Sequence, residues 1–332
     1  MQVDFAVPVS ASPLEIEAAA VDAEKRGYHG FGAPETRHDV FTALGLAARA
    51  TSRLTLQSAI AVAFARNPMS VAILANDLQL ISAGRFQLGL GSQIRPHIER
   101  RFAMPWSHPA ARMEEFIAAI RAIWHSWATG DRLAFRGTFY QHTLMTDFFN
   151  PGPSAYGNPP VFLAAVGERM TVVAGRVADG LMVHSFTTEQ YLRDHTLPAL
   201  RAARGKLDDF TLCLPAMVVL GADEAERARA EQAIRGQIAF YGSTPAYRGV
   251  LDRHGWGDLH ERLNAMSRGQ AWAEMADAIG DDVLDTFAVS GDAAAVAAGL
   301  QTRFGDIVDR ISLYTPYPAD PAQLAAVAAA LR

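Results

Sequence analysis

Short runs of apolar residues alternate with longer amphipathic segments along most of the chain. Eight of the runs have the length and β-branched content of strands. They are Val3 to Val9, His29 to Pro34, Leu54 to Ala61, Arg85 to Leu90, Pro160 to Val166, Gly180 to Phe186, Leu212 to Leu220 and Val308 to Thr315. Most are apolar without a break, which is typical of strands buried on both faces of a parallel sheet. The pattern predicts repeated β-α-β units.

The segments between the runs carry helix signals. The sequence Ser12-Pro13-Leu14-Glu15 has the pattern of a capping box with proline in the first turn, and Gly27 follows the end of that helix. Asn67-Pro68 begins another helix, which ends before Gly84. Between Pro109 and Gly130, apolar residues recur at helical spacing, so this helix turns one face to the core. Those residues are Met113, Phe116, Ile117, Ile120, Ile123, Trp124 and Trp127.

Eight strand-helix units predict a closed (β/α)8 TIM barrel of the α/β class rather than an open sheet. The chain has 332 residues, a length that such barrels commonly hold in one domain. Residues 131–159 and 221–290 exceed ordinary connections, so we interpret them as insertions that can cover one face of the barrel. No Ser/Gly linker and no internal repeat interrupts the pattern, which predicts a single domain over residues 1–332.

Composition and charge narrow the class of partner. The formal net charge is −5 and the basic residues are dispersed, which argues against nucleic acid and favours a small molecule. No apolar run approaches the roughly 18 residues of a membrane span, and no basic region precedes the first apolar stretch, so we expect a cytoplasmic protein without a membrane partner. The single cysteine, Cys213, excludes an intrachain disulfide and lies in an apolar strand, which favours an inert core thiol.

The segment "GRFQLGLGSQIRPHIERRF", residues 84–102, contains three glycines that invite a phosphate-binding interpretation. A P-loop requires lysine where Leu90 stands, and a dinucleotide fingerprint requires glycine where Ile94 stands. Both motifs therefore fail. There remains a strand whose carboxyl end, Gly91-Ser92-Gln93, offers backbone amides and two polar side chains.

The active site of such a barrel lies at the carboxyl ends of the strands. The second strand is followed by Glu35 and His38, a carboxylate and an imidazole that can exchange a proton with a ligand. Alternatively, Asp39 caps the next helix and His38 lies in solvent. The sequence leaves both interpretations open.

Further candidates for binding or catalysis each have a structural alternative. The amides of Val166, Gly167 and Glu168 can hold a phosphate at a helix N-terminus, although ordinary strand-to-helix turns have the same pattern. His184 ends the sixth strand, where structural histidines are common. The ten histidines include no H-x-x-x-H pair with a carboxylate, so we predict no metal site, and no G-x-S-x-G motif indicates a serine hydrolase.

Arginines follow the glycine-rich strand. Arg95, Arg100 and Arg101 can hold an anionic ligand longer than one phosphate. Glu99 interrupts them, so a solvated helix face is the alternative.

The segment "DLQLISAGRFQLGLGSQ", with "LQSAIAVAFARNPMSVA" before it and "GRVADGLMVHSF" after it, resembles the luciferase-like monooxygenase superfamily, and most closely its coenzyme F420-dependent oxidoreductase branch. The resemblance covers nearly the whole chain. The segments "RRFAMPWSHPAARMEEF", "FRGTFYQHTLM", "FFNPGP" and "AFYGSTPAYRGVLDRHGW" are similar to one subgroup of that branch.

The resemblance implies a bacterial luciferase-like barrel that binds F420 or FMN at the strand carboxyl ends, usually as a homodimer. It also implies a non-prolyl cis peptide bond behind the flavin-like ring, here Ala59-Ile60. The implied cofactor contacts are Gly91, Ser92, Gln93, Val166, Gly167 and Glu168, to which we add His184. His97, Trp106 and His108 are the remaining candidates for the substrate pocket.

The leading hypothesis is an F420-dependent oxidoreductase that transfers a hydride between the deazaflavin C5 and a small organic substrate, with His38 and Glu35 as the proton relay. Glucose-6-phosphate dehydrogenases of the superfamily carry Asp-His directly after the second strand, whereas here Thr36 follows Glu35 and His38 comes two residues later. The alternatives are an FMN-dependent monooxygenase and a flavin-binding barrel without turnover. F420 carries a polyglutamate tail, so Arg95, Arg100 and Arg101 favour F420 if they face it.

Overall fold

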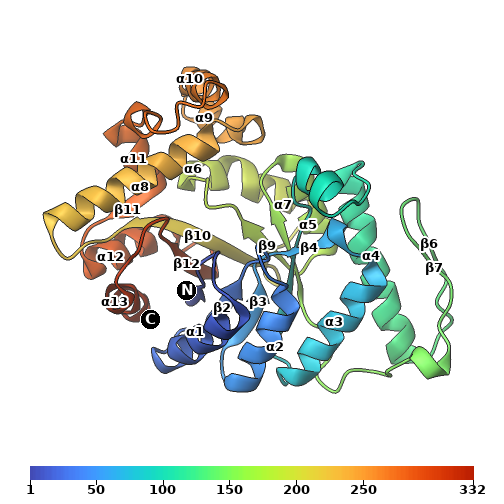
Figure 1. Ribbon diagram of the computed structural model, residues 1–332. Helices are drawn as coiled ribbons and strands as arrows, with labels where there is room; N and C mark the ends of the chain where they lie inside the picture. Colours follow the sequence, from blue (N-terminus) through green and yellow to red (C-terminus); the bar gives the residue numbers. More distant parts are fainter.

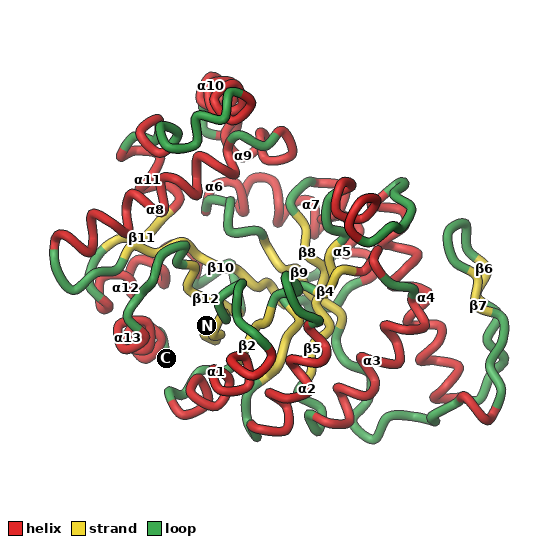
Figure 2. Tube along the Cα trace, viewed as in Figure 1, coloured by secondary structure: helices red, strands yellow, loops and turns green.

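Eight parallel strands form a closed ring in the computed structural model, which describes all residues from 1 to 332. They are β1 (Gln2–Ala6), β2 (Gly30–Ala33), β3 (Thr55–Ser58), β5 (Phe86–Gly91), β8 (Val161–Ala165), β9 (Gly180–Val183), β10 (Thr211–Val219) and β12 (Arg310–Tyr314). Each strand pairs with the next in this order, and β12 pairs with β1, so the ring closes (Figures 1 and 2). The predicted (β/α)8 barrel is confirmed.

Helices surround the ring, and all except the short α6 bury apolar residues against it (Figure 1). They are α1 (Pro13–Lys25), α2 (Val40–Ala50), α3 (Pro68–Ile81), α4 (Pro109–Thr129), α5 (Glu168–Val177), the short α6 (Glu189–Tyr191), α7 (Leu197–Arg204), α12 (Ala293–Phe304) and α13 (Pro321–Ala330). Ser12 caps α1 with both bonds of the capping box, and Asn67 caps α3, as their sequences predict. No helix combines the length and apolar content needed to cross a membrane.

The first insertion, residues 131–159, lies along the outer side of α4 rather than over the mouth of the barrel (Figure 1). It contains an antiparallel hairpin of β6 (Phe135–Arg136) and β7 (Gln141–His142). The carboxylate of Glu115, in the first half of α4, accepts hydrogen bonds from three backbone amides at the hairpin tip, those of Thr138, Phe139 and Tyr140. The expectation that this segment covers a barrel face is therefore wrong.

The second insertion, residues 221–290, does cover part of the carboxyl end of the barrel. It contains α8 (Glu224–Gly242), α9 (Arg248–Arg253), α10 (Gly257–Arg268), α11 (Asp281–Phe287) and β11 (Ala288–Ser290), which pairs with β10. These helices share a second hydrophobic core with Phe186, just after β9, and with Met217 and Val219 of β10. They therefore roof one side of the barrel mouth, at the upper left of Figure 1.

A buried ion pair fills the amino-terminal end of the barrel interior. Arg310, the first residue of β12, donates from Nε and Nη2 to the two carboxylate oxygens of Asp4 on β1, at 2.8 and 2.6 Å. Both side chains are about nine-tenths buried. Burial alone would lower the pKa of Arg310, but the Asp4 carboxylate has the opposite effect and the pKa is raised. The guanidinium therefore stays charged. A Cβ at Gly30 would clash with Nη2 of Arg310, so glycine leaves the room that the pair needs.

Replacing one member of this pair will destabilise the barrel. The variant Arg310→Met leaves the Asp4 carboxylate buried without its partner, which we expect to lower the free energy of unfolding by about 3–5 kcal/mol. The matched control Arg95→Met breaks the exposed pair with Glu99 and should leave the free energy of unfolding nearly unchanged, because solvent screens that pair. Urea unfolding followed by circular dichroism measures both, and equal losses would refute the structural role of the buried pair.

Candidate active site

The third strand is divided where the sequence predicts one continuous run. β3 ends at Ser58, the peptide bond Ala59-Ile60 is cis, and a short strand β4 (Ala61–Val62) continues beyond it. β3 pairs with the beginning of β5, whereas β4 pairs with its end, at Leu90 and Gly91. The cis bond stands at the position that the resemblance implies, and the strand prediction Leu54 to Ala61 is corrected to two strands.

Glu35, in the loop after β2, holds the segment that follows the cis bond. Its backbone N–H donates to the carbonyl of Ile60 at 3.2 Å, and its carboxylate Oε2 accepts from the N–H of Val62 at 2.7 Å. The N–H of Ala59 donates to the carbonyl of Ala33 at 2.7 Å. The end of β2 and the loop after it thus fix the backbone of residues 59–62 through three hydrogen bonds.

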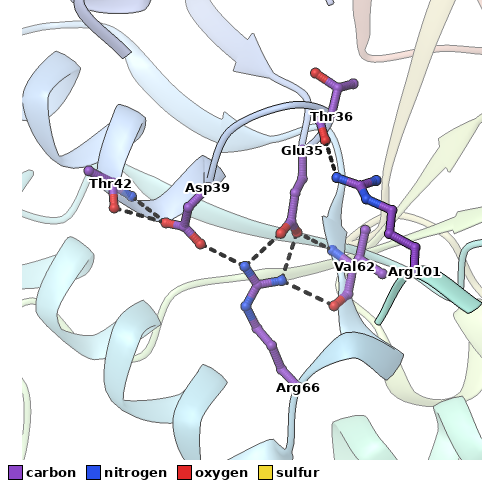
Figure 3. A network of polar contacts seen from close by, with 7 residues as sticks. All are labelled: Glu35, Thr36, Asp39, Thr42, Val62, Arg66 and Arg101. Carbon is purple, nitrogen blue, oxygen red and sulfur yellow. Dashed lines mark hydrogen bonds and ion pairs between the residues drawn. The ribbon is translucent and has the colours of Figure 1, made fainter. Parts of the chain in front are cut away.

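Arg66, which follows the 3-10 turn Ala63–Ala65 after β4, completes this network (Figure 3). Its guanidinium donates to both carboxylate oxygens of Glu35 at 2.6 and 2.7 Å, and to Asp39 Oδ2 at 2.6 Å. Burial alone would lower the pKa of Arg66, but the two carboxylates raise it. Only 7% of the Glu35 side chain is exposed, so its charge is compensated within the protein rather than by water.

Asp39 also caps α2, because its Oδ1 accepts from the N–H of Thr42 at 2.8 Å. Burial acts to raise the pKa of Asp39, but the bonds from Thr42 and Arg66 outweigh it and lower the pKa. His38 is exposed, and no hydrogen bond joins it to Glu35. Of the two interpretations of this loop, the helix cap with a solvated His38 describes the observed structure, and the expected pairing of Glu35 with His38 is absent.

Sequence reasoning missed Arg66. Its bidentate partner, Glu35, comes from a different strand-to-helix loop, 31 residues away along the chain. Arg66 directly precedes the helix cap Asn67, and nothing in that local pattern distinguishes it from a solvated arginine. The signal for this network was one arginine and two carboxylates at the ends of neighbouring strands. It can be recognised only when the order of the strands in the barrel is known.

The three arginines after β5 have different environments. Arg95 pairs with Glu99 at 2.9 Å and is mostly exposed. Arg101 donates to the carbonyl of Thr36, which ties the β5 loop to the β2 loop (Figure 3). Arg100 is exposed and makes no hydrogen bond or ion pair. The structure therefore leaves Arg100 as the free cation of the three.

The three pocket candidates after β5, which are Trp106, His108 and His97, do not lie together around one site. Trp106 is half-buried and packs edge-on against Phe64, with ring centroids 5.6 Å apart. His108 is exposed beside Phe139 of the hairpin, at 6.0 Å, and His97 is exposed on the π-helical turn that contains Arg100 and Arg101. Only Trp106 is packed as a pocket wall would be.

The turn into α5 leaves its amides open. Gly167 is the N-cap of α5 and provides no side-chain cap, and a Cβ there would meet no atom within 4 Å. A cavity of about 350 Å³ adjoins this turn, lined by Val166, Glu168 and Thr171 on one side and by Asp194 on the other. The amides suit a phosphate, whereas the two carboxylates disfavour a long anion deeper in the cavity.

Strand register shows which side chains point into the barrel. Gln57 Nε2 lies 3.9 Å from Cys213 Sγ, although β3 and β10 are not neighbours, so both side chains point inward. Cys213 is in register with Met182 and Arg310, and Met182 with Ala164, so these residues also face inward. The Cys213 thiol is buried, which raises its pKa to about 12, so it stays protonated and inert.

One half of the barrel mouth is lined by small residues. Alternation along each strand places Gly32, Ala59, Gly91 and Ala164 on the inward face near the carboxyl ends. At Gly91 a Cβ would lie 2.7 Å from Cδ1 of Ile60, beside the cis bond. Small side chains in this small-residue half would let a flat group come close to the strand ends, and Glu35 and Arg66 hold one part of its backbone, residues 59–62.

The opposite half is aromatic. His184 follows β9 and lies two residues beyond inward-facing Met182, and Tyr314 ends β12 on the face of Arg310. His184 Nδ1 accepts from the N–H of Phe186 at 3.0 Å, so its proton resides on Nε2, 3.2 Å from the Tyr247 hydroxyl. Burial lowers the pKa of His184 to about 4, which keeps the ring neutral. No group of three or more His, Cys, Asp or Glu side chains is arranged to hold a metal ion.

Comparison with known proteins agrees with this geometry. Residues 4–310 match the model of the luciferase-like monooxygenase family. An uncharacterised protein of Mycobacterium tuberculosis, Rv1360, is 51% identical over 298 residues, which are 88% of this chain and 87% of that one. A 5,10-methylenetetrahydromethanopterin reductase of Archaeoglobus fulgidus is 26% identical, with 76% of this chain and 74% of that one covered.

Among solved structures, the coenzyme F420-dependent tetrahydromethanopterin reductase from Methanopyrus kandleri superposes with a TM-score of 0.79. The match covers 99% of this chain and 97% of that chain at 18% sequence identity, so it supports the fold alone. The family match spans most of the barrel and includes every strand that carries the small-residue half. The chain therefore belongs to the luciferase-like monooxygenase family.

Proposed function

We propose that the chain is an F420-dependent oxidoreductase acting on a small organic substrate. The observation that carries this proposal is the small-residue half of the mouth, whose wall at residues 59–62 is held from behind by Glu35 and Arg66. A flat deazaflavin ring fits against such a wall. When bound, F420 supplies or accepts a hydride. Relatives whose names state a dependence on F420 support the same cofactor.

The chain's own residues would hold the cofactor at three places. Ala59 and Ile60 would back the ring, and residues 91–93 with the open amides of residues 166–168 would hold the ribityl and phosphate groups. The exposed cations Arg37 and Arg100 lie on the loops after β2 and β5, where an anionic tail would leave the mouth. FMN has no such tail, so these cations favour F420.

His38 is the proposed proton donor or acceptor, and Glu35 is a positioning residue. The Glu35 carboxylate already accepts from Val62 and Arg66, so taking up a proton would break the network that fixes residues 59–62. His38 is exposed at the same loop and free to exchange a proton with a ligand or water. The pair predicted from the sequence is thus divided into two roles.

Cofactor titration tests the proposed function directly. We expect the apoprotein to bind F420 more tightly than FMN, with an affinity that falls as salt rises, because the tail is anionic. The quenching of F420 or FMN fluorescence gives both affinities. A preference for FMN would support the luciferase-like monooxygenase alternative, and binding without turnover of any substrate would support the non-catalytic barrel.

Filling the small-residue half should weaken cofactor binding. The variant Gly91→Ala adds a Cβ against Ile60 and into the space proposed for the ring, so we expect F420 affinity to fall about tenfold. The matched control Gly236→Ala adds a Cβ in α8, where the nearest neighbour, Cβ of Ala276, lies 4.0 Å away, and should leave affinity unchanged. Equal affinities for the two variants would contradict the proposed ring position.

Glu35 and His38 can be separated by paired amide variants. Glu35→Gln removes the charge that compensates Arg66, so we expect about 1–3 kcal/mol lower stability and weaker F420 binding. His38→Gln should alter neither quantity, because the His38 side chain is exposed and unpaired. Urea unfolding and F420 titration measure both. Wild-type stability and affinity in Glu35→Gln would show that the network does not position the ring.

A further inference from the structure

Four aromatic side chains form a continuous wall opposite the small-residue half. This aromatic wall consists of His184 after β9, Tyr314 at the end of β12, Tyr241 of α8 and Tyr247 of the 3-10 turn Pro245–Tyr247. His184 stacks on Tyr247 and meets Tyr241 edge-on, with ring centroids 4.7 Å apart in both cases. The second insertion therefore completes the wall over the strand ends.

The wall presents neutral hydroxyl groups. The hydroxyls of Tyr241 and Tyr314 lie 3.2 Å apart, so one donates to the other and the pair keeps one further hydrogen to donate. Burial, together with Tyr241, raises the pKa of Tyr314 and raises that of Tyr247 to about 12. Both phenols therefore stay protonated at neutral pH, and the wall can donate to a substrate oxygen.

The wall has no cation. None of its hydrogen bonds or ring contacts involves Lys or Arg. The two arginines of α9, which follows Tyr247, already pair with carboxylates, Arg248 with Asp252 and Arg253 with Asp194. The only lysines, Lys25 and Lys206, lie where helices α1 and α7 lead back to the amino ends of the strands. A phosphate or carboxylate would find no counter-charge at this wall.

We propose that the aromatic wall binds the substrate, and that the substrate is an uncharged alcohol or carbonyl compound with an apolar or aromatic body. Its oxygen would accept from, or donate to, the Tyr241–Tyr314 hydroxyl pair, and its body would pack on Tyr247 and His184. The proposal rests on the proposed function, because the wall faces the place proposed for the ring across the barrel mouth. It assigns Tyr241 and Tyr314 as the residues that select a neutral substrate.

A matched pair of ligands tests this selection without turnover. We would titrate the full-length apoprotein with benzyl alcohol and with benzyl phosphate, using ligand-observed NMR to obtain dissociation constants. The proteins are wild type, Tyr241→Phe, the double variant Tyr241→Phe/Tyr314→Phe, and Tyr156→Phe as a control. Tyr156 lies beside Gly84, ahead of the amino end of β5, so its hydroxyl is remote from the wall.

We expect benzyl alcohol to bind wild type and the control equally, and the double variant about three- to tenfold more weakly, because the hydroxyl contacts are lost. Tyr241→Phe, which keeps the ring and alters one partly exposed helix position, should show a smaller loss in the same direction. Benzyl phosphate should bind at least tenfold more weakly than the alcohol to wild type. Absence of alcohol binding, unchanged affinity in the double variant, or equal binding of the phosphate would each overturn the proposal.

F420 titration of the same proteins distinguishes failure of the proposed substrate wall from failure of the proposed F420-dependent function. If F420 binds but benzyl alcohol does not, the aromatic wall is not the substrate site and the proposed cofactor is retained. If the alcohol binds and depends on the tyrosines but F420 does not bind, the proposed function fails while the wall remains a neutral-ligand site.

Discussion

Closure of the ring depends on joining the first strand to the last, and the Asp4–Arg310 pair lies inside that junction. A barrel of this size must fill its interior with side chains. Burying a charged pair there costs desolvation free energy, which is offset only when each carboxylate oxygen accepts a hydrogen bond. Here the guanidinium binds both carboxylate oxygens, and Gln2 also accepts from it. Since the amino-terminal end is filled in this way, the open space lies at the carboxyl end, where the loops meet.

That open end has two unlike halves because neighbouring strands end differently. Strands β2, β3, β5 and β8 bring glycine and alanine to the mouth, and their loops carry the cations. Strands β9 and β12, with the roof from α8 to α11, bring neutral aromatic rings. The anionic cofactor and the uncharged substrate that we propose would thus lie against different sides of the mouth.

The sequence contained enough to predict the strands, the capped helices and the closed barrel, because apolar periodicity and caps such as Ser12 and Asn67 are local signals. The resemblance supplied the position of the cis bond. What could not be predicted was non-local: Arg66 is paired across two loops, and the hairpin is placed by Glu115 of α4. The aromatic wall combines Tyr314 of β12, His184 after β9 and two tyrosines of an insertion, and no spacing along the chain reveals such a combination.

The buried Cys213 thiol has a practical consequence. It is the only cysteine of the chain, and burial holds it in the protonated state. A cysteine introduced at an exposed position, such as Arg100 on the loop after β5, would therefore be the sole thiol open to a maleimide dye. For labelling, the native sequence therefore serves as a cysteine-free background, and a dye can be attached to that loop without removing the natural cysteine.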